Sequence, residues 1–137
     1  MNFDLSEEQQ LVSDSIERFV QENYHLENRV AIVKQAPGYS EDYWKTMSEL
    51  GWLGLPFSED DGGFGGNQID TMVLMEQFGK GLVLEPYLAS IILGGGAIKR
   101  AGSEEQRRAR LESVIDGSKQ LALAYAEPES GYEPHNV

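Results

Sequence analysis

The sequence contains no cysteine, which excludes disulfides and thiolate metal sites. Histidine is nearly absent as well: His25 and His135 are the only two, and neither has a second ligand at helical spacing. Basic residues are outnumbered, with 11 Lys and Arg against 23 Asp and Glu, so the net charge is -12. A surface of this charge repels nucleic acid and anionic membranes. We therefore expect neither a metal site nor a nucleic acid partner.

The sequence also shows no pattern of a secretory leader and no long apolar run, so we expect neither a leader nor a membrane span. Asp4, Glu7 and Glu8 stand where a signal peptide needs a basic start and an apolar core. No apolar stretch approaches the roughly 20 residues of a membrane-spanning helix. The expected location is therefore the cytoplasm, without a membrane span. With 40% hydrophobic and 25% charged residues over 137 positions, the chain has the composition of a folded domain with a core.

Helical patterns fill most of the first 118 residues. Ser6 with Gln9 forms a capping box, and apolar residues then recur at helical spacing to about Asn23. Residues 24–34 could continue this helix or form a second one. Further helices are predicted to begin near Ser40, Asn67, Pro86 and Ser103. The expected fold is all-α, a bundle of five or six helices.

The end of the sequence has a different pattern. Residues 121–126, Leu-Ala-Leu-Ala-Tyr-Ala, read as a strand, and Pro128 and Gly131 follow as turn residues. One strand alone cannot pair its backbone groups. We therefore expect a helical domain over 1–118 and the first strand of a truncated β-domain over 119–137.

Two features have both a structural and a chemical interpretation. The loop 62–66 holds four glycines, which could cradle a phosphate, but it lacks the Lys-Ser/Thr of a P-loop and we favour a structural turn. Glu76 lies on an otherwise apolar helix, where a carboxylate is paired, protonated or facing a cavity. A buried pair with Lys80 or Arg100 is the favoured interpretation. Gly94 to Gly96 either end a helix or leave room for a neighbour.

Six segments in order carry a resemblance to a known family: Leu5–Gln9, Leu50–Pro56, Asp61–Gly66, Glu76–Gly79, Gly102–Gln106 and Leu121–Gly131. Together they resemble the N-terminal helical domain of acyl-CoA dehydrogenases. More narrowly, Phe57–Gly66, Val83–Leu88 and Ile92–Gly96 resemble small subunits of pimeloyl-CoA-type dehydrogenases. Such subunits pair with a larger homologous subunit.

The resemblance implies FAD-dependent α,β-desaturation of an acyl-CoA thioester, followed by electron transfer to an acceptor. The flavin would supply the redox chemistry, and the catalytic base would lie in a C-terminal domain, so no catalytic residue is assigned here. A fragment of this kind is expected to be inactive alone. The alternatives are a noncatalytic helical interaction module and a degenerate subunit of a heteromeric dehydrogenase.

The resemblance also implies site residues. Those implied near the flavin are Leu123, Tyr125, Ala126, Gly131 and Tyr132. Those implied near the acyl chain are Glu76, Leu88, Ile91, Ile92, Gly95 and Tyr132, and a bulky residue at Gly95 is expected to shorten the accepted chain. Two positions depart from the family pattern: Ala126 stands where a Thr or Ser hydroxyl is usual, and Tyr132 where a Ser is usual. Ala126 therefore removes a side-chain donor to the flavin.

Overall fold

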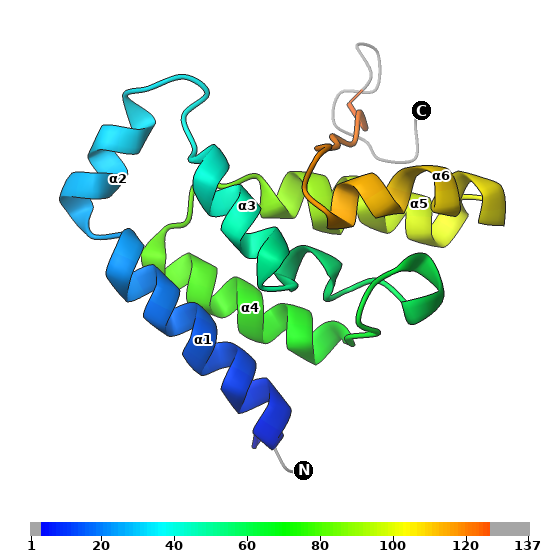
Figure 1. Ribbon diagram of the computed structural model, residues 1–137, viewed down its shortest axis with the longest axis horizontal. Coiled ribbons are helices and arrows are strands. Elements are labelled where there is room, and N and C mark those ends of the chain that lie inside the picture. The colour runs from blue at the N-terminus through cyan, green and yellow to red at the C-terminus, as the bar shows by residue number, and fades with distance from the viewer. Residues whose placement is uncertain (1–3, 127–137) are drawn as a thin grey trace.

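The computed structural model describes residues 4–126, which form a two-layered helical body (Figure 1). Its α-helices are α1 (Glu7–Asn23), α2 (Leu26–Val33), α3 (Glu41–Glu49), α4 (Gln68–Gly81), α5 (Gly96–Ala101) and α6 (Glu104–Ile115). Two 3-10 turns, η1 (Trp52–Gly54) and η2 (Glu59–Asp61), and a π-helical segment, η3 (Leu88–Gly95), complete the elements. The predicted all-α fold of five or six helices is confirmed, with six α-helices and no strand in the described residues.

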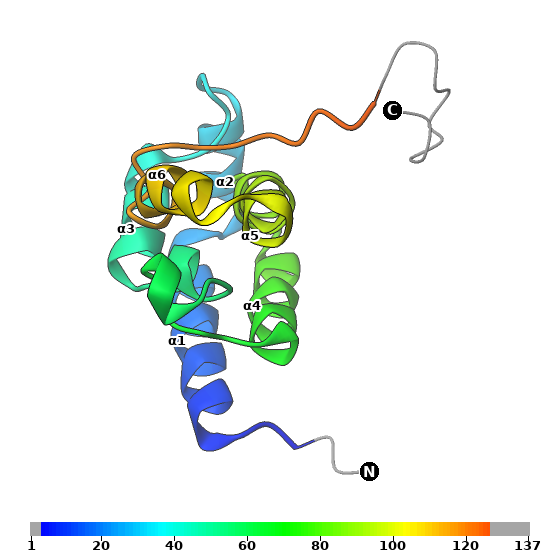
Figure 2. The same ribbon diagram turned by 90° about the vertical axis from the view of Figure 1, so that its right-hand side faces the viewer.

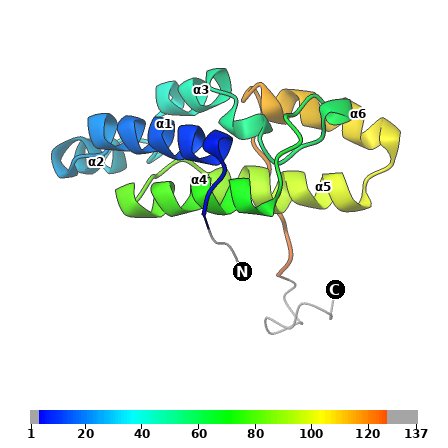
Figure 3. The same cartoon turned by 90° about the horizontal axis from the view of Figure 1, so that it is seen from below.

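The helices lie in two layers, seen most clearly from below in Figure 3. One layer holds α1, α3 and α6, and the other holds α4 and the continuous rod made by η3 and α5. The α1 and α4 helices pack along their length, and α6 packs beside the rod. The rod carries most of the predicted acyl-facing residues, and α6 of the opposite layer packs against it.

Helix starts are set by local hydrogen bonds, as the sequence predicts. Capping boxes begin α1, α4 and α6, where the side chains of Ser6, Asn67 and Ser103 accept from backbone amides of the first turn. Each satisfies donors that a helix start leaves without an intrahelical partner. The stretch after Asn23 forms a separate helix, α2, because the chain leaves helical geometry at Tyr24, whose side chain is buried.

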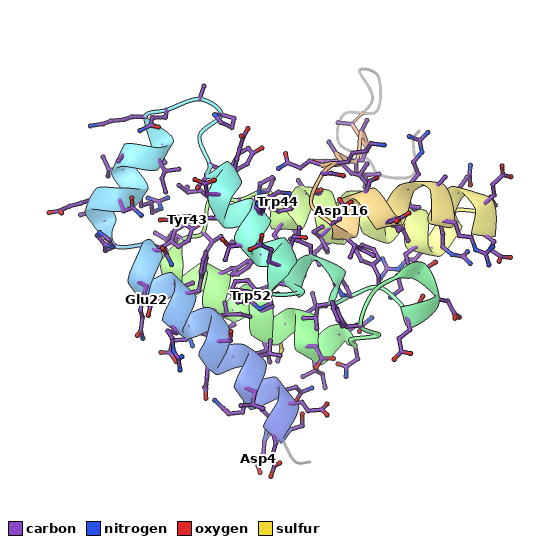
Figure 4. The ribbon with its side chains drawn as sticks, in the orientation of Figure 1. Asp4, Glu22, Tyr43, Trp44, Trp52 and Asp116 are labelled. Atoms are coloured by element: carbon purple, nitrogen blue, oxygen red, sulfur yellow. The ribbon has the colours of Figure 1, made fainter. Side chains whose placement is uncertain are left out.

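Aromatic side chains fill the space between the layers. Trp52 lies at the centre of Figure 4, with its ring 5.3 Å from that of Phe19 on α1 and 6.0 Å from that of Phe78 on α4. Phe78 in turn meets Tyr87 edge-on at 5.3 Å. Such edge-to-face pairs are worth about 0.5–1.5 kcal/mol beyond their buried area. The rings therefore link α1, η1, α4 and the start of the η3 rod.

The chain after α6 turns at Gly117, whose φ is +78°, and crosses back over the body. Figures 2 and 3 show it passing α6 and the η3–α5 rod and leaving beyond them. Residues 121–126 have no neighbouring strand in the described part of the chain, so the predicted strand is not formed there. Pairing is what defines a strand, and a lone segment has no partner to provide it.

The glycine loop 62–66 is a structural turn, as favoured from the sequence. All five of its backbone N–H groups donate within the protein, to carbonyls of residues 54–59. No amide remains to cradle a phosphate. Gly63 lies so close to the carbonyl oxygens of Phe57 and Gly54 that a Cβ atom would overlap both.

This packing predicts that Gly63→Ala destabilises the protein by about 1–3 kcal/mol, because backbone atoms must move to admit the methyl group. Gly79→Ala is the matched control: Gly79 is in α4, nothing lies within 4 Å of its added Cβ, and alanine favours the helix by about 1 kcal/mol. Urea unfolding followed by circular dichroism measures both. Equal midpoints for the two variants would contradict the packing argument.

Candidate functional site

Most of the predicted acyl-facing residues lie on η3. The side chain of Ile91 is fully buried in the core, that of Ile92 is partly buried, and Leu88 is 52% exposed. The segment therefore turns one side inward and leaves another side open. Its open side presents Leu88 and Leu93 to solvent.

The π-helical geometry of η3 extends to a run of three glycines, of which Gly94 and Gly95 end η3 and Gly96 begins α5. The N–H of Gly96 donates to the carbonyl of Ile91, five residues earlier. Such π turns are rare and often occur at functional sites. The helix does not end at the glycines, and two neighbours take up room there: a Cβ at Gly95 would lie 2.6 Å from the Phe57 ring, and one at Gly94 would lie 2.5 Å from Cβ of Leu121.

Gly95 is thus placed against a buried aromatic ring. Phe57 is fully buried, so it cannot swing away to admit a larger residue at this position. In the described residues Gly95 serves close packing between η3 and the loop after η1. Its predicted effect on acyl chain length stays a prediction.

A cleft of about 460 Å³ lies between the start of α4 and the η3–α5 rod. Ile91 and Ile92 give it apolar lining, and Lys99 and Arg100 give it positive charge. The Lys99 ammonium donates to the carbonyl of Pro56. The remaining lining residues are Pro56, Gly66, Asn67, Gln68 and Thr71. The cleft can accept an apolar group beside an anionic or polar one.

Glu76 forms the predicted ion pair with Lys80, with a 2.9 Å distance between Oε1 and Nζ. The pair is in solvent, however, because the Glu76 side chain is 59% exposed. The expected burial is wrong for the described residues: α4 buries only Val73, Leu74, Gln77 and Phe78. An exposed pair four residues apart contributes about 0.3–0.5 kcal/mol.

The predicted flavin-facing residues leave the helical body. Leu123, Tyr125 and Ala126 are all exposed, and one local bond, from the Tyr125 N–H to the Leu123 carbonyl at 3.1 Å, bends the segment. Gly131 and Tyr132 lie outside the described residues. Within residues 4–126, no cluster of three metal-ligating side chains occurs, and no helix has both the length and the hydropathy to cross a membrane.

Glu85 is a buried carboxylate that the sequence patterns did not reveal. Only 5% of it is exposed, and burial raises the pKa of its carboxyl group. The Tyr24 hydroxyl and the Ser40 N–H both donate to it, the latter at 3.1 Å. Glu85 therefore ties the end of α1 and the start of α3 to the residues that enter η3. The sequence feature that could have drawn attention to Glu85 is its place between Leu84 and Pro86, just ahead of a helix.

The comparisons with known proteins agree with this architecture. Residues 6–118 match the model of the acyl-CoA dehydrogenase N-terminal domain. A probable acyl-CoA dehydrogenase of Bacillus subtilis, YngJ, is 33% identical over 96% of this chain and 34% of its own length. The chain spans about a third of the length of the curated relatives it matches.

Solved structures show the same fold. The ChsE4–ChsE5 complex from Mycobacterium tuberculosis superposes with a TM-score of 0.85 and 25% identity, over 96% of this chain and 36% of the matched one. An acyl-CoA dehydrogenase complexed with FAD from Bacillus anthracis gives a TM-score of 0.81 and 27% identity, over 93% of this chain and 22% of that one.

The raised pKa of Glu85 makes its contribution to stability dependent on pH. The contribution is full below the ordinary carboxyl pKa of 4.5 and is lost as pH rises through the raised pKa of the folded protein. Glu85→Gln removes the titration, so the difference in unfolding free energy between wild type and variant should shrink from pH 4 to pH 7. Denaturant unfolding across this range measures it.

Tyr24→Phe provides a second variant, since it removes the hydroxyl that donates to Glu85. Loss of this donor raises the pKa of Glu85 further, so the decline should extend to higher pH than in the wild type. Parallel pH profiles for wild type and Glu85→Gln would contradict the assignment.

Proposed function

The chain belongs to the acyl-CoA dehydrogenase family through its N-terminal domain, and from this we propose that it forms the helical wall of the acyl site in a flavin-dependent dehydrogenase. The reaction proposed for the complete protein is α,β-desaturation of an acyl-CoA thioester. The main support for this proposal is the path of residues 121–126, which pass the η3–α5 rod and leave the helical body. This path would bring a second domain next to the open side of η3.

Exposed apolar side chains support the proposal that a ligand or another domain covers this part of the protein. Leu88 and Leu93 on η3, and Ile69 and Met72 on α4, are each at least 40% exposed. Exposed large apolar side chains on two neighbouring elements of one layer are consistent with a surface that other protein or ligand covers. Acyl chain and β-domain are the occupants that we propose.

The last described residues suit a flavin. Tyr125 offers a half-exposed aromatic ring, and the backbone of 122–126 makes no hydrogen bond to the helical body among the described residues. When bound, FAD would supply the acceptor for the hydride. Leu123, Tyr125 and Ala126 would hold it by contact and by backbone groups, because Ala126 has no hydroxyl to donate. Leu88 and Ile92 would hold the acyl chain.

The complete protein is proposed to work with partners. A homologous dehydrogenase subunit is supported by the likeness to a protein of the ChsE4–ChsE5 complex. An electron-transfer acceptor is required because the reduced flavin must be reoxidised. The chain alone is proposed to be inactive, since no base for the α-proton is assigned to it.

Ala126 favours a second candidate, a degenerate subunit that supports an active homologous partner. Without the usual hydroxyl, a flavin at this position would lose one hydrogen bond, worth about 0.5–1.5 kcal/mol. Such a subunit would contribute its helical surface to the assembly and no turnover.

The first test is reconstitution of the chain, completed with the rest of its protein, with its partner subunit. We expect a bound yellow flavin whose absorbance bleaches when a saturated acyl-CoA is added. Stable colour without bleaching would favour the degenerate subunit, and a colourless assembly would overturn the flavin proposal.

The second test uses Leu88→Trp in the same assembly. Because Leu88 is exposed in the described chain, the indole can be accommodated without disturbing the core, and it should narrow the proposed acyl site. We expect kcat/KM to fall for long acyl-CoA substrates by about tenfold or more relative to short ones, as an obstructed pocket of this kind predicts. Leu26→Trp on α2 is the control, since Leu26 is 73% exposed. An unchanged chain-length profile would refute the placement of Leu88.

A further inference from the structure

The last residue of the departing segment that contacts η3 is Leu121. Its N–H donates to the Ser90 hydroxyl oxygen at 2.9 Å, and its side chain packs against the core. Ser90 is fully buried on η3. Just before it, Gln120 and the Tyr39 hydroxyl bond to each other at 3.0–3.2 Å near the surface. Beyond Leu121, the described residues make no further hydrogen bond to the helices.

Gly94 provides the second half of this contact. A Cβ atom there would lie 2.5 Å from Cβ of Leu121 and 3.4 Å from its carbonyl carbon. The obstructing atoms belong to the backbone region of Leu121 and not to the tip of a flexible side chain, so a methyl group would displace the chain itself. Ser90 and Gly94 stand four residues apart on η3, and Leu121 meets both of them.

A hydrogen bond to a buried hydroxyl fixes the direction of the backbone at Leu121, and contact with a glycine fixes its distance from η3. The same π-helical segment turns Leu88 and Leu93 outward to solvent. The position of residues 122–126 is therefore set relative to η3, which also carries the exposed Leu88 and Leu93. The bonds between Gln120 and Tyr39 hold the chain one residue earlier, and no hydrogen bond to the helices follows Leu121 in the described residues.

We propose that Ser90 and Gly94 form a seat for Leu121 that positions the flavin-facing segment relative to the acyl-facing side of η3. Ser90 and Gly94 are positioning residues and touch neither substrate nor cofactor. The part of this inference that concerns flavin rests on the proposed function. The seat itself rests on the contacts of Leu121 alone. The glycine at 94 is needed for the close approach of Leu121 and not for space in an acyl channel.

The first arm of the test measures amide hydrogen exchange by NMR in the chain itself. Ser90→Ala and Gly94→Ala should each speed exchange at Leu121 about fivefold to tenfold, the loss expected for one hydrogen bond, while amides in α1 and α4 keep their rates. Gly96→Ala is the matched control, because it lies in the same glycine run and nothing is within 4 Å of its added Cβ. Equal Leu121 rates in all four proteins would overturn the seat.

The second arm uses the completed protein with its partner and flavin. Gly94→Ala should shift the flavin absorption band and lower kcat with little change in KM, because the two sides of the site are displaced relative to each other. Gly96→Ala should change neither. A normal spectrum and kcat in Gly94→Ala would overturn the positioning role. A wild-type assembly without flavin would overturn the proposed function, and the exchange arm would still decide the seat.

Discussion

The aromatic contacts around Trp52 are the constraint on which the rest of the structure depends. Its ring joins Phe19 and Phe78 across the two layers, and its carbonyl accepts a 2.9 Å hydrogen bond from the Tyr87 hydroxyl. Tyr87 is almost fully buried, which raises the pKa of its phenol far above the ordinary value and keeps it a donor. Since Tyr87 immediately precedes η3, this one bond sets where the rod begins.

Further contacts along η3 fix its position and that of the segment after α6. Glu85 secures the residues before the rod to α1 and α3, and Phe57 packs into the place that Gly95 leaves free. Leu121 then rests on Gly94. The exposed Leu88 and Leu93 and the contact of the departing segment with the helical body therefore both lie on η3.

The sequence was sufficient for features that depend on neighbours a few residues away. The capping boxes at Ser6, Asn67 and Ser103 and the glycine turn were predictable because their hydrogen bonds are local. The burial of carboxylates was not: Glu85 is buried by Tyr24, 61 residues earlier, and Glu76 is exposed because α4 turns another side to α1. The π-helical turn and the contact with Leu121 likewise depend on distant chain. A strand at 121–126 needs a partner that these residues do not provide.

The glycine loop has a further consequence for how the protein resists proteolysis. A protease must draw a stretch of backbone into extended form, and glycine-rich loops are often where it succeeds. Here every N–H of the loop 62–66 is bonded to the turns before it, so an extended form requires those turns to come apart as well. Cleavage in this loop would therefore report joint opening of the loop and the turns at residues 54–59, whereas cleavage at residues 122–126 would break no hydrogen bond to the helices.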